Sequence, residues 1–273
     1  MRAWVNGKLL DDPSAPAVTV SDHGLTVGDG VFEAVKIVDD RPFALTLHLE
    51  RLKRSAAGLG LPEYDEGLVR KGVEAVLAGG GLALGRLRIT YTGGPAPMGS
   101  GRGSGPATLI VAVDTLVVAQ ETTAVLRVPW VRNERSAVAG LKTTSYAENV
   151  VALARAKESG ATEAIFANSA GNLCEGTGSN IGYVLDGEAR TPSLASGCLA
   201  GVTRALLLEW CDVVEVDEPV AVIADASEVF LASTTRDVQG VERWDHRDLP
   251  APGPVTAEAL ATWRRREPEL LGV

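Results

Sequence analysis

The spacing of apolar positions predicts a chain in which strands and helices of ordinary length follow one another. Short alternating or continuous apolar runs predict strands at 31–38, 86–92, 108–113, 163–167, 181–185 and 229–232. Apolar residues three and four positions apart predict helices at 46–58, 65–78, 146–159 and 199–210. The inward faces are expected to consist of Leu49, Leu52 and Ala56 in the first helix and of Val150, Leu153 and Ala154 in the third.

Turn residues mark where several of these elements end. Asn6-Gly7 and Asp186-Gly187 are typical of the tight turns in β-hairpins. Thr46 is in place to cap the first helix, and Gly160 to end the third. The glycine-rich segment 93–105 lacks the spacing of a phosphate-binding P-loop, and we expect it to be a mobile loop that borders the active site.

Length and composition indicate a globular protein with a substantial core. A chain of 273 residues can form one large domain or two smaller ones. A linker at 117–121 favours two, a small N-terminal domain of residues 1–116 and a larger C-terminal domain of residues 122–273. Hydrophobic residues make up 45% and charged residues 22%, and no apolar run approaches the ~20 residues that span a bilayer.

Charge and cysteine content narrow the expected partners. The net charge of -9 argues against nucleic acid and against an anionic membrane. The three cysteines lack metal-ligand spacing and are interpreted as reduced thiols of a cytoplasmic protein. The three histidines are scattered along the chain, so we expect no metal site.

The stretch from Gly140 to Asn180 carries the residues on which a functional assignment depends. Lys142 lies on a short polar loop before a helix, where a lysine taken alone is usually a solvated surface cation. Glu175 opens the segment Glu-Gly-Thr-Gly-Ser-Asn that closes this stretch. Two further motifs lie outside it, His-Leu-Glu-Arg-Leu at 48–52 and Gly-Val-Thr-Arg at 201–204.

Together these motifs resemble the class IV aminotransferases, a family that depends on pyridoxal 5'-phosphate (PLP). The family includes branched-chain and D-amino-acid aminotransferases and 4-amino-4-deoxychorismate lyase. The resemblance extends from Val18 through Val241. It implies a two-domain α/β (α+β) fold of the D-amino-acid aminotransferase type, with the active site between the domains and PLP as cofactor. It also implies a small-molecule substrate and a homodimer.

The resemblance assigns roles to the motif residues. Lys142 matches the family's catalytic Schiff-base lysine, Glu175 the partner of the pyridine nitrogen, and Tyr146 a donor to the ring oxygen. Periodicity alone favours a solvent-facing helix charge for Arg51, whereas the resemblance makes it a phosphate ligand, for which the planar fork of an arginine is suited. The remaining cofactor-binding residues implied are Asn180, Val202, Thr203 and Thr234, of which Val202 and Thr203 lie at a helix start that favours anions.

The substrate wall is less clearly marked. Phe32 and Lys36 occupy alternate positions of the first predicted strand, so they would face the substrate together. D-amino-acid enzymes of the family end the strand that corresponds to 88–92 with Arg-Gly, and here Thr92-Gly93 stands in that place. Further substrate-binding candidates are therefore Arg88, Arg102 and the backbone of Thr235.

Three functions remain open at this point. The segments 99–107 and 142–156 resemble aminodeoxychorismate lyases most, which favours release of pyruvate to give 4-aminobenzoate for folate synthesis. A transaminase for branched-chain or D-amino acids uses the same lysine and the same acidic partner. A non-catalytic protein that binds phosphorylated ligands is the third hypothesis, although both Lys142 and Glu175 are present.

Overall fold

The computed structural model describes all 273 residues and divides them into two compact units. The first unit comprises Met1–Val118, Leu141–Ser145 and Leu270–Val273, and the second comprises Ala119–Gly140 and Tyr146–Glu269. Two short segments that the sequence analysis assigned to the larger domain therefore lie in the first unit.

Backbone hydrogen bonds explain why both segments join the first unit. The Phe32 N–H donates to the Lys142 carbonyl at 3.0 Å, which ties 141–145 to the start of a strand. The Ala44 N–H donates to the Leu270 carbonyl at 2.8 Å, which ties the last residues of the chain to the start of a helix. A boundary drawn from composition at one linker cannot anticipate such returns of the chain.

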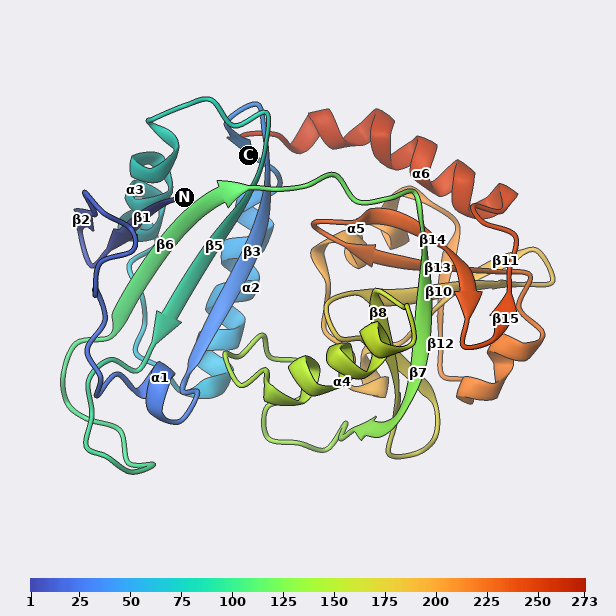
Figure 1. Ribbon diagram of the computed structural model, residues 1–273, viewed down its shortest axis with the longest axis horizontal. Helices are drawn as coiled ribbons and strands as arrows, with labels where there is room; N and C mark the ends of the chain where they lie inside the picture. The colour runs from blue at the N-terminus through green and yellow to red at the C-terminus, as the bar shows by residue number, and fades with distance from the viewer. The chain divides into compact units, whose positions relative to one another are not determined.

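The first unit is a six-stranded antiparallel sheet in the spatial order β2-β1-β6-β5-β3-β4. Helices α2 and α3 lie along one face of this sheet, behind it in the view of Figure 1. The strands are β1 Arg2–Val5, β2 Lys8–Leu9, β3 Gly30–Val38, β4 Arg41–Pro42, β5 Leu84–Thr92 and β6 Thr108–Thr115. The helices are α1 His23–Thr26, α2 Leu45–Leu59 and α3 Glu66–Leu77.

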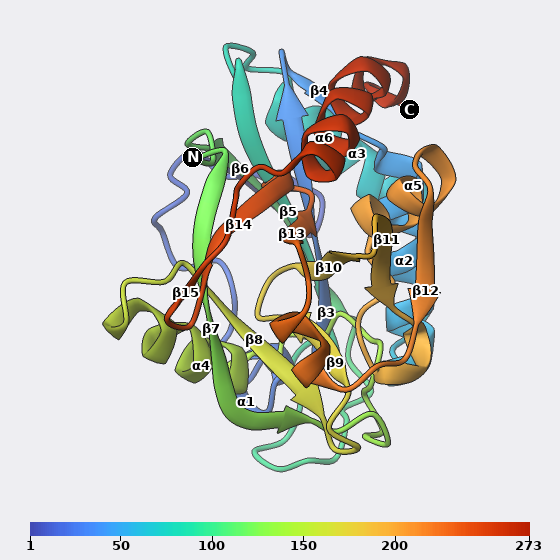
Figure 2. The same ribbon diagram turned by 90° about the vertical axis from the view of Figure 1, so that its right-hand side faces the viewer.

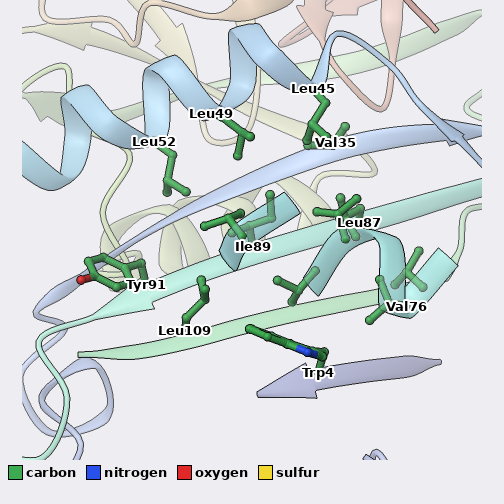
Figure 3. Packing of buried hydrophobic residues seen from close by; sticks show 14 of the residues in the cluster. Trp4, Val35, Leu45, Leu49, Leu52, Val76, Leu87, Ile89, Tyr91 and Leu109 are labelled. Carbon is green, nitrogen blue, oxygen red and sulfur yellow. The ribbon is translucent and has the colours of Figure 1, made fainter. Parts of the chain in front are cut away.

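The core of the first unit fills the space between the sheet and α2 and α3 (Figure 3). Leu49 and Leu52 of α2 are fully buried, which confirms the inward face expected from the periodicity. They pack with β3 and β5 residues on the same sheet face, among them Val35 and Ile89. Alternate positions of β3 and β5 therefore face the core, and the intervening positions form the opposite face of the sheet.

The start of α2 differs from the expectation that Thr46 caps it. Thr46 lies inside the first turn, and the N-cap residue Ala44 has a left-handed backbone and no side chain that could accept a hydrogen bond. The N–H groups of Ala44 and Thr46 donate instead to the carbonyls of Leu270 and Val273, at 2.8 and 3.2 Å. A distant backbone segment thus satisfies donors that a local side chain usually satisfies.

The second unit is built on a nine-stranded mixed sheet in the order β12-β11-β10-β13-β14-β7-β8-β9, with β15 paired to β14. Figure 2 shows β7 and β8 side by side with α4 next to them. The strands are β7 Thr122–Arg132, β8 Glu163–Asn168, β9 Leu173–Gly176, β10 Asn180–Leu185, β11 Glu188–Pro192, β12 Val213–Val216, β13 Glu228–Ser233, β14 Asp237–Trp244 and β15 Arg247–Asp248. The helices are α4 Ala147–Glu158, α5 Val202–Trp210 and α6 Pro254–Arg266, with 3-10 turns at Leu194–Ser196, Val220–Ala224 and Glu267–Leu270.

Helix α4 buries a different face from the one expected. Its buried residues are Asn149, Ala152 and Ala156, whereas Val150 is 64% exposed. The two alanines pack in a cluster with β7 and β8 residues such as Phe166, where small side chains allow a close approach of the helix to the sheet. Helix α6 was not anticipated, because its apolar positions are few. None of the helices is long and apolar enough to cross a membrane.

Candidate functional site

Lys142 is held by its backbone against the start of β3. Its N–H donates to the Ser55 hydroxyl on α2 at 3.2 Å, and its carbonyl accepts from the Phe32 N–H. Its Nζ lies 4.4 Å from the centre of the Phe32 ring, within the range of a cation–π contact. The loop position predicted for this lysine is therefore confirmed, and the loop is anchored on both sides.

The same face of the sheet gathers basic side chains. Phe32 and Lys36 lie on this face as expected, and the Arg88 guanidinium carbon lies 3.8 Å from the centre of the Phe32 ring. Lys36 is buried, with Nζ 5.7 Å from the centre of the Phe43 ring. The register pairs Lys36 with Arg86, a residue that sequence reasoning did not single out. Because cross-strand partners point to the same side, Arg86 adds another cation to this face.

Arg51 is buried and not a surface charge, so the interpretation that periodicity alone favoured is wrong. The residue is 5% exposed, and its Nε and Nη2 donate to the two carboxylate oxygens of Glu33 at 2.8 and 2.6 Å. The His48 Nδ1 lies 2.8 Å from the same carboxylate. Burial by itself raises the pKa of Glu33, but the Arg51 charge and the hydrogen bonds from Arg51 and His48 outweigh it and lower the pKa to about 2.

Arg102 anchors the glycine-rich loop. Its Nε and Nη2 donate to the Asp29 carboxylate, and its guanidinium also donates to the carbonyls of Leu59 and Gly60 at the end of α2. His23 adds a contact from Nε2 to the Gly99 carbonyl at 2.8 Å. The structure thus gives Arg102 a part in fixing the loop.

In the second unit Glu175 and Asn180 meet the same short segment. The Leu199 N–H donates to Glu175 Oε2 at 2.9 Å, and the Asn180 side-chain amide donates to the Leu199 carbonyl at 2.9 Å. Glu175 Oε1 lies 3.4 Å from Arg132 Nε, a partner that no sequence pattern predicted. Arg132 thus places a positive charge beside the carboxylate at the end of β9. Tyr146 lies at the N-cap position of α4.

The start of α5 has the features of an anion site. Gly201 is its N-cap residue and offers no side-chain cap, so the first N–H groups of the helix have no intrahelical partner. A Cβ at Gly201 would collide with Asn180 Oδ1, so the close approach requires glycine. Thr203 is 2% exposed, and its Oγ1 is buried without a hydrogen-bond partner. A buried hydroxyl that is left unpaired fits a bound phosphate.

Thr234 and Thr235 follow the end of β13. The register places Ala232 of β13 opposite Asn180 of β10, so Thr234 comes two residues beyond this pair. Ser233 carries a second buried hydroxyl without a hydrogen-bond partner. Ser233 was missed in the sequence, where nothing separates it from other strand-end serines.

The chain is similar to known proteins over most of its length. The family model described as amino-transferase class IV matches residues 30–244. The bifunctional aminodeoxychorismate lyase / D-amino acid transaminase of Mycobacterium tuberculosis is 30% identical, over 92% of this chain and 93% of its own. The solved branched-chain aminotransferase of Thermoproteus uzoniensis superposes with a TM-score of 0.91 at 27% identity, over 99% of this chain and 98% of its own. This likeness confirms the expected two-domain α/β fold.

A further solved structure bears on the cofactor. An aminotransferase from Mycobacterium tuberculosis, described as hypothetical and solved in a PLP-bound form, has a TM-score of 0.86 and 26% identity, over 98% of this chain and 99% of its own. The unpaired hydroxyl of Thr203 and the helix start at Gly201 fit the phosphate of such a cofactor.

Proposed function

Because the chain belongs to the class IV aminotransferase family, whose members are PLP-dependent enzymes, we propose that it is a 4-amino-4-deoxychorismate lyase. The observation that carries this proposal is the basic face of the sheet in the first unit, with Lys36, Arg86 and Arg88 on neighbouring positions of β3 and β5. A substrate with two carboxylates, one on a ring and one on an enolpyruvyl group, suits several cations spread over one surface.

Several residues of the chain are proposed to hold PLP. We assign the covalent attachment of PLP to Lys142. We assign Glu175 as the partner of the ring nitrogen, and the positive charge of Arg132 lies beside its carboxylate. The phosphate ligands proposed are Arg51, Thr234, the Thr203 hydroxyl and the N–H groups at the start of α5, including that of Val202. Asn180 supports that helix start through Leu199, and Tyr146 is assigned to the ring oxygen as the resemblance implies.

Lys142 also supplies the acid–base step. When bound, PLP supplies an electron sink for the substrate carbon that bears the amine. The Lys142 Nζ would be the general base that removes the proton from that carbon. The bond between the ring and the enolpyruvyl oxygen breaks, the enolpyruvyl group leaves and becomes pyruvate, and the ring becomes aromatic.

Phe32 and the residues around it would orient the substrate. The Phe32 ring contacts both Lys142 and Arg88, so it lies between the proposed general base and the basic side chains of the sheet. Thr92, where D-amino-acid enzymes of the family have arginine, is buried and donates its hydroxyl to Asp22 at 2.8 Å. It is therefore in no position to hold a substrate carboxylate, and Arg88 and Lys36 are the better candidates. Thr235, just after β13, keeps its proposed backbone contact with the substrate carboxylate.

A transaminase for D-amino or branched-chain amino acids is the second candidate. The names of the relatives favour it, since one is bifunctional and one solved neighbour is a branched-chain aminotransferase. The two activities share the proton-abstraction step and differ in what leaves the substrate. The hypothesis of a non-catalytic protein is set aside, because the chain belongs to a family of PLP enzymes.

A parallel assay distinguishes the two candidates. The PLP-loaded enzyme is incubated with aminodeoxychorismate, and pyruvate is followed through its reduction to lactate while 4-aminobenzoate is followed by fluorescence. The same preparation is tested with L- and D-amino acids and a 2-oxo acid acceptor. We expect pyruvate and 4-aminobenzoate in equal amounts. Rapid transamination without release of pyruvate would overturn the lyase assignment and leave the PLP assignment intact.

We also propose that the enzyme is a homodimer, which rests on the family resemblance alone. Light scattering after size-exclusion chromatography measures the mass of the particle directly. A mass of one chain at micromolar concentration would contradict the proposal.

A further inference from the structure

The carboxylate of Glu33 is out of place in the core of the first unit. It lies on β3 between Val31 and Val35, on the sheet face that packs against α2, and all three side chains are 0% exposed. Burying a carboxylate costs several kcal/mol, and replacing a buried ion pair by apolar side chains is often neutral or stabilising. Stability alone therefore does not explain why an acidic residue occupies this position.

Glu33 fixes the orientation of Arg51. Its two oxygens accept from Nε and Nη2 of Arg51, a fork that uses two of the five N–H donors of the guanidinium. Such a bidentate pair sets both the position and the plane of the guanidinium. A guanidinium held in a fixed position and plane suits a clamp for the oxygens of a phosphate monoester.

His48 fixes Glu33 in turn. Its Nδ1 lies 2.8 Å from Glu33 Oε2, and a carboxylate can only accept, so Nδ1 carries the proton. Burial lowers the pKa of His48 despite the carboxylate beside it, so the ring is neutral and Nε2 is an acceptor. This buried network from His48 through Glu33 to Arg51 contains one positive and one negative charge, both at defined positions.

We propose that Glu33 is a positioning residue for phosphate binding, which acts through Arg51 and is itself oriented by the Nδ1–H of His48. The proposal rests on the proposed function, because it takes Arg51 to be a phosphate ligand. A neutral amide at position 33 would leave the guanidinium in the core but without its fork. The cost falls on the phosphate and not on the rest of the cofactor.

Comparing PLP with pyridoxal, which lacks the phosphate, isolates this effect. Dissociation constants of both are measured by absorbance for the full-length chain and for Glu33→Gln. Both molecules form the same bond with Lys142. The ratio of the PLP affinity to the pyridoxal affinity therefore reports the phosphate contacts alone. Glu33→Gln should lower the ratio about tenfold, the equivalent of one charge-assisted hydrogen bond. In a chain that already carries Arg51→Ala, Glu33→Gln should change the ratio no further.

Three further variants separate positioning from a purely structural role. Glu33→Asp keeps the charge but withdraws the carboxylate by one methylene, so it should lower the ratio as Glu33→Gln does. This variant also keeps the test possible if Glu33→Gln fails to fold. His48→Asn keeps a donor near the place of Nδ1 and should keep most of the ratio, whereas His48→Leu should lower it. Glu228→Gln is the matched control, since Glu228 is also buried but accepts from the N–H groups of Val255 and Thr256 at the start of α6. It should leave the ratio unchanged.

The outcomes are distinct for the two proposals. If Arg51→Ala lowers the ratio while Glu33→Gln and Glu33→Asp leave it at the parent value, the positioning role is overturned and the phosphate role of Arg51 stands. If Arg51→Ala itself leaves the ratio unchanged, Arg51 is no phosphate ligand, and the proposed cofactor contact fails together with the inference built on it. A ratio that falls in the Glu33 variants only when Arg51 is present supports the proposal.

Discussion

The Arg102 guanidinium binds the Asp29 carboxylate with two parallel hydrogen bonds, Nε to Oδ2 at 2.8 Å and Nη2 to Oδ1 at 2.6 Å. The same guanidinium donates to the carbonyls of Leu59 and Gly60, where the last turn of α2 leaves carbonyls without intrahelical donors. One side chain thus joins the glycine-rich loop, the segment before β3 and the end of α2. This arrangement changes what a substitution of Arg102 is expected to do.

Arg102→Ala should release the glycine-rich loop at a cost of about 1 kcal/mol in the free energy of unfolding, because the ion pair is partly exposed and two carbonyls lose a donor. Hydrogen exchange of residues 96–104 measures the release, and denaturant unfolding measures the cost. Arg70→Ala, which breaks an exposed pair with Glu66 on α3, is the control and should leave loop exchange unchanged. Loop exchange equal to that of the parent in Arg102→Ala would show that other contacts hold the loop.

The loop contact of His23 should depend on pH. Nε2 faces the Gly99 carbonyl and Nδ1 lies 3.2 Å from Asp29 Oδ2, so both nitrogens face acceptors and only the imidazolium can donate to both. The hydrogen bond with Asp29, followed by that with Gly99, raises the pKa of His23, although burial and, to a smaller extent, the Arg102 charge lower it. The stabilisation gained by donating from both nitrogens is therefore fully present below the ordinary pKa of 6.5, and it is lost as the pH rises through the raised pKa.

Hydrogen exchange of the loop, corrected for the intrinsic effect of pH, tests this expectation. Protection of residues 96–104 should fall as the imidazolium loses its proton, and a His23→Asn variant should show no such transition. Asp22 lies beside His23 in the chain but is occupied by the Gly24 N–H and by two threonine hydroxyls, so it does not replace Asp29. A transition that persists in His23→Asn would assign the titration to another group.

Glu33 should make the protein sensitive to acid. Its pKa is lowered to about 2 in the folded chain from an ordinary value of 4.5. Its contribution to stability is therefore complete above pH 4.5 and is lost as the pH falls through 2, with a size on the order of 3 kcal/mol. The difference in unfolding free energy between the parent and Glu33→Gln, measured against pH, should shrink over this window. A constant difference would show that Glu33 has the same pKa in the folded and unfolded chains.

Lys142 should be the one residue that is labelled when the PLP-loaded enzyme is reduced with borohydride. Its backbone is fixed at Ser55 and Phe32, and its amine lies over an aromatic ring on the basic sheet face. Peptide mapping identifies the labelled site, with Lys36 and Lys157 as internal controls. Lys142→Ala should still bind PLP without a covalent bond but show no turnover. A label on Lys36 would move the covalent attachment to the strand.

Gly201→Ala should weaken PLP binding by about tenfold or more, because the added Cβ displaces Asn180 Oδ1 and disturbs the helix start beside Thr203. The effect should appear with PLP and be smaller with pyridoxal. Gly101→Ala is the matched control, since a Cβ at Gly101 meets open space. Parent-like PLP affinity in Gly201→Ala would argue against a phosphate at this helix start.

The sequence predicted the elements better than the faces they bury. Strand β3 and helix α2 came out within one or two residues, because their apolar spacing is regular and long. The inward face of α4 came out wrong, because its contact with the sheet uses Ala152 and Ala156, and alanine gives little signal in a hydrophobic pattern. Local spacing reports which residues are apolar, but the packing of a small-residue face depends on the partner element.

Ion pairs between residues far apart in the sequence were also not predicted. Arg51 looked like a surface charge because its partner Glu33 lies 18 residues earlier, on a strand whose other core positions are apolar. The contact of Arg132 with Glu175 was not predicted either, because these two residues are also far apart in the sequence. The residues carried by motifs, such as Thr203 and Gly201, were found because a helix start binds anions through local backbone geometry.

The discontinuity of the first unit has a consequence for the order of events on the ribosome. A nascent chain that has released residues 1–118 carries every strand of the six-stranded sheet, yet it lacks 141–145 and the carbonyls of Leu270 and Val273 that bind the first N–H groups of α2. The N-terminal part of a chain folds first during synthesis, so α2 forms with an unsatisfied start. The lysine loop can reach its place on β3 only after residue 145 has been made, and the helix start is completed only after residue 273 has been made.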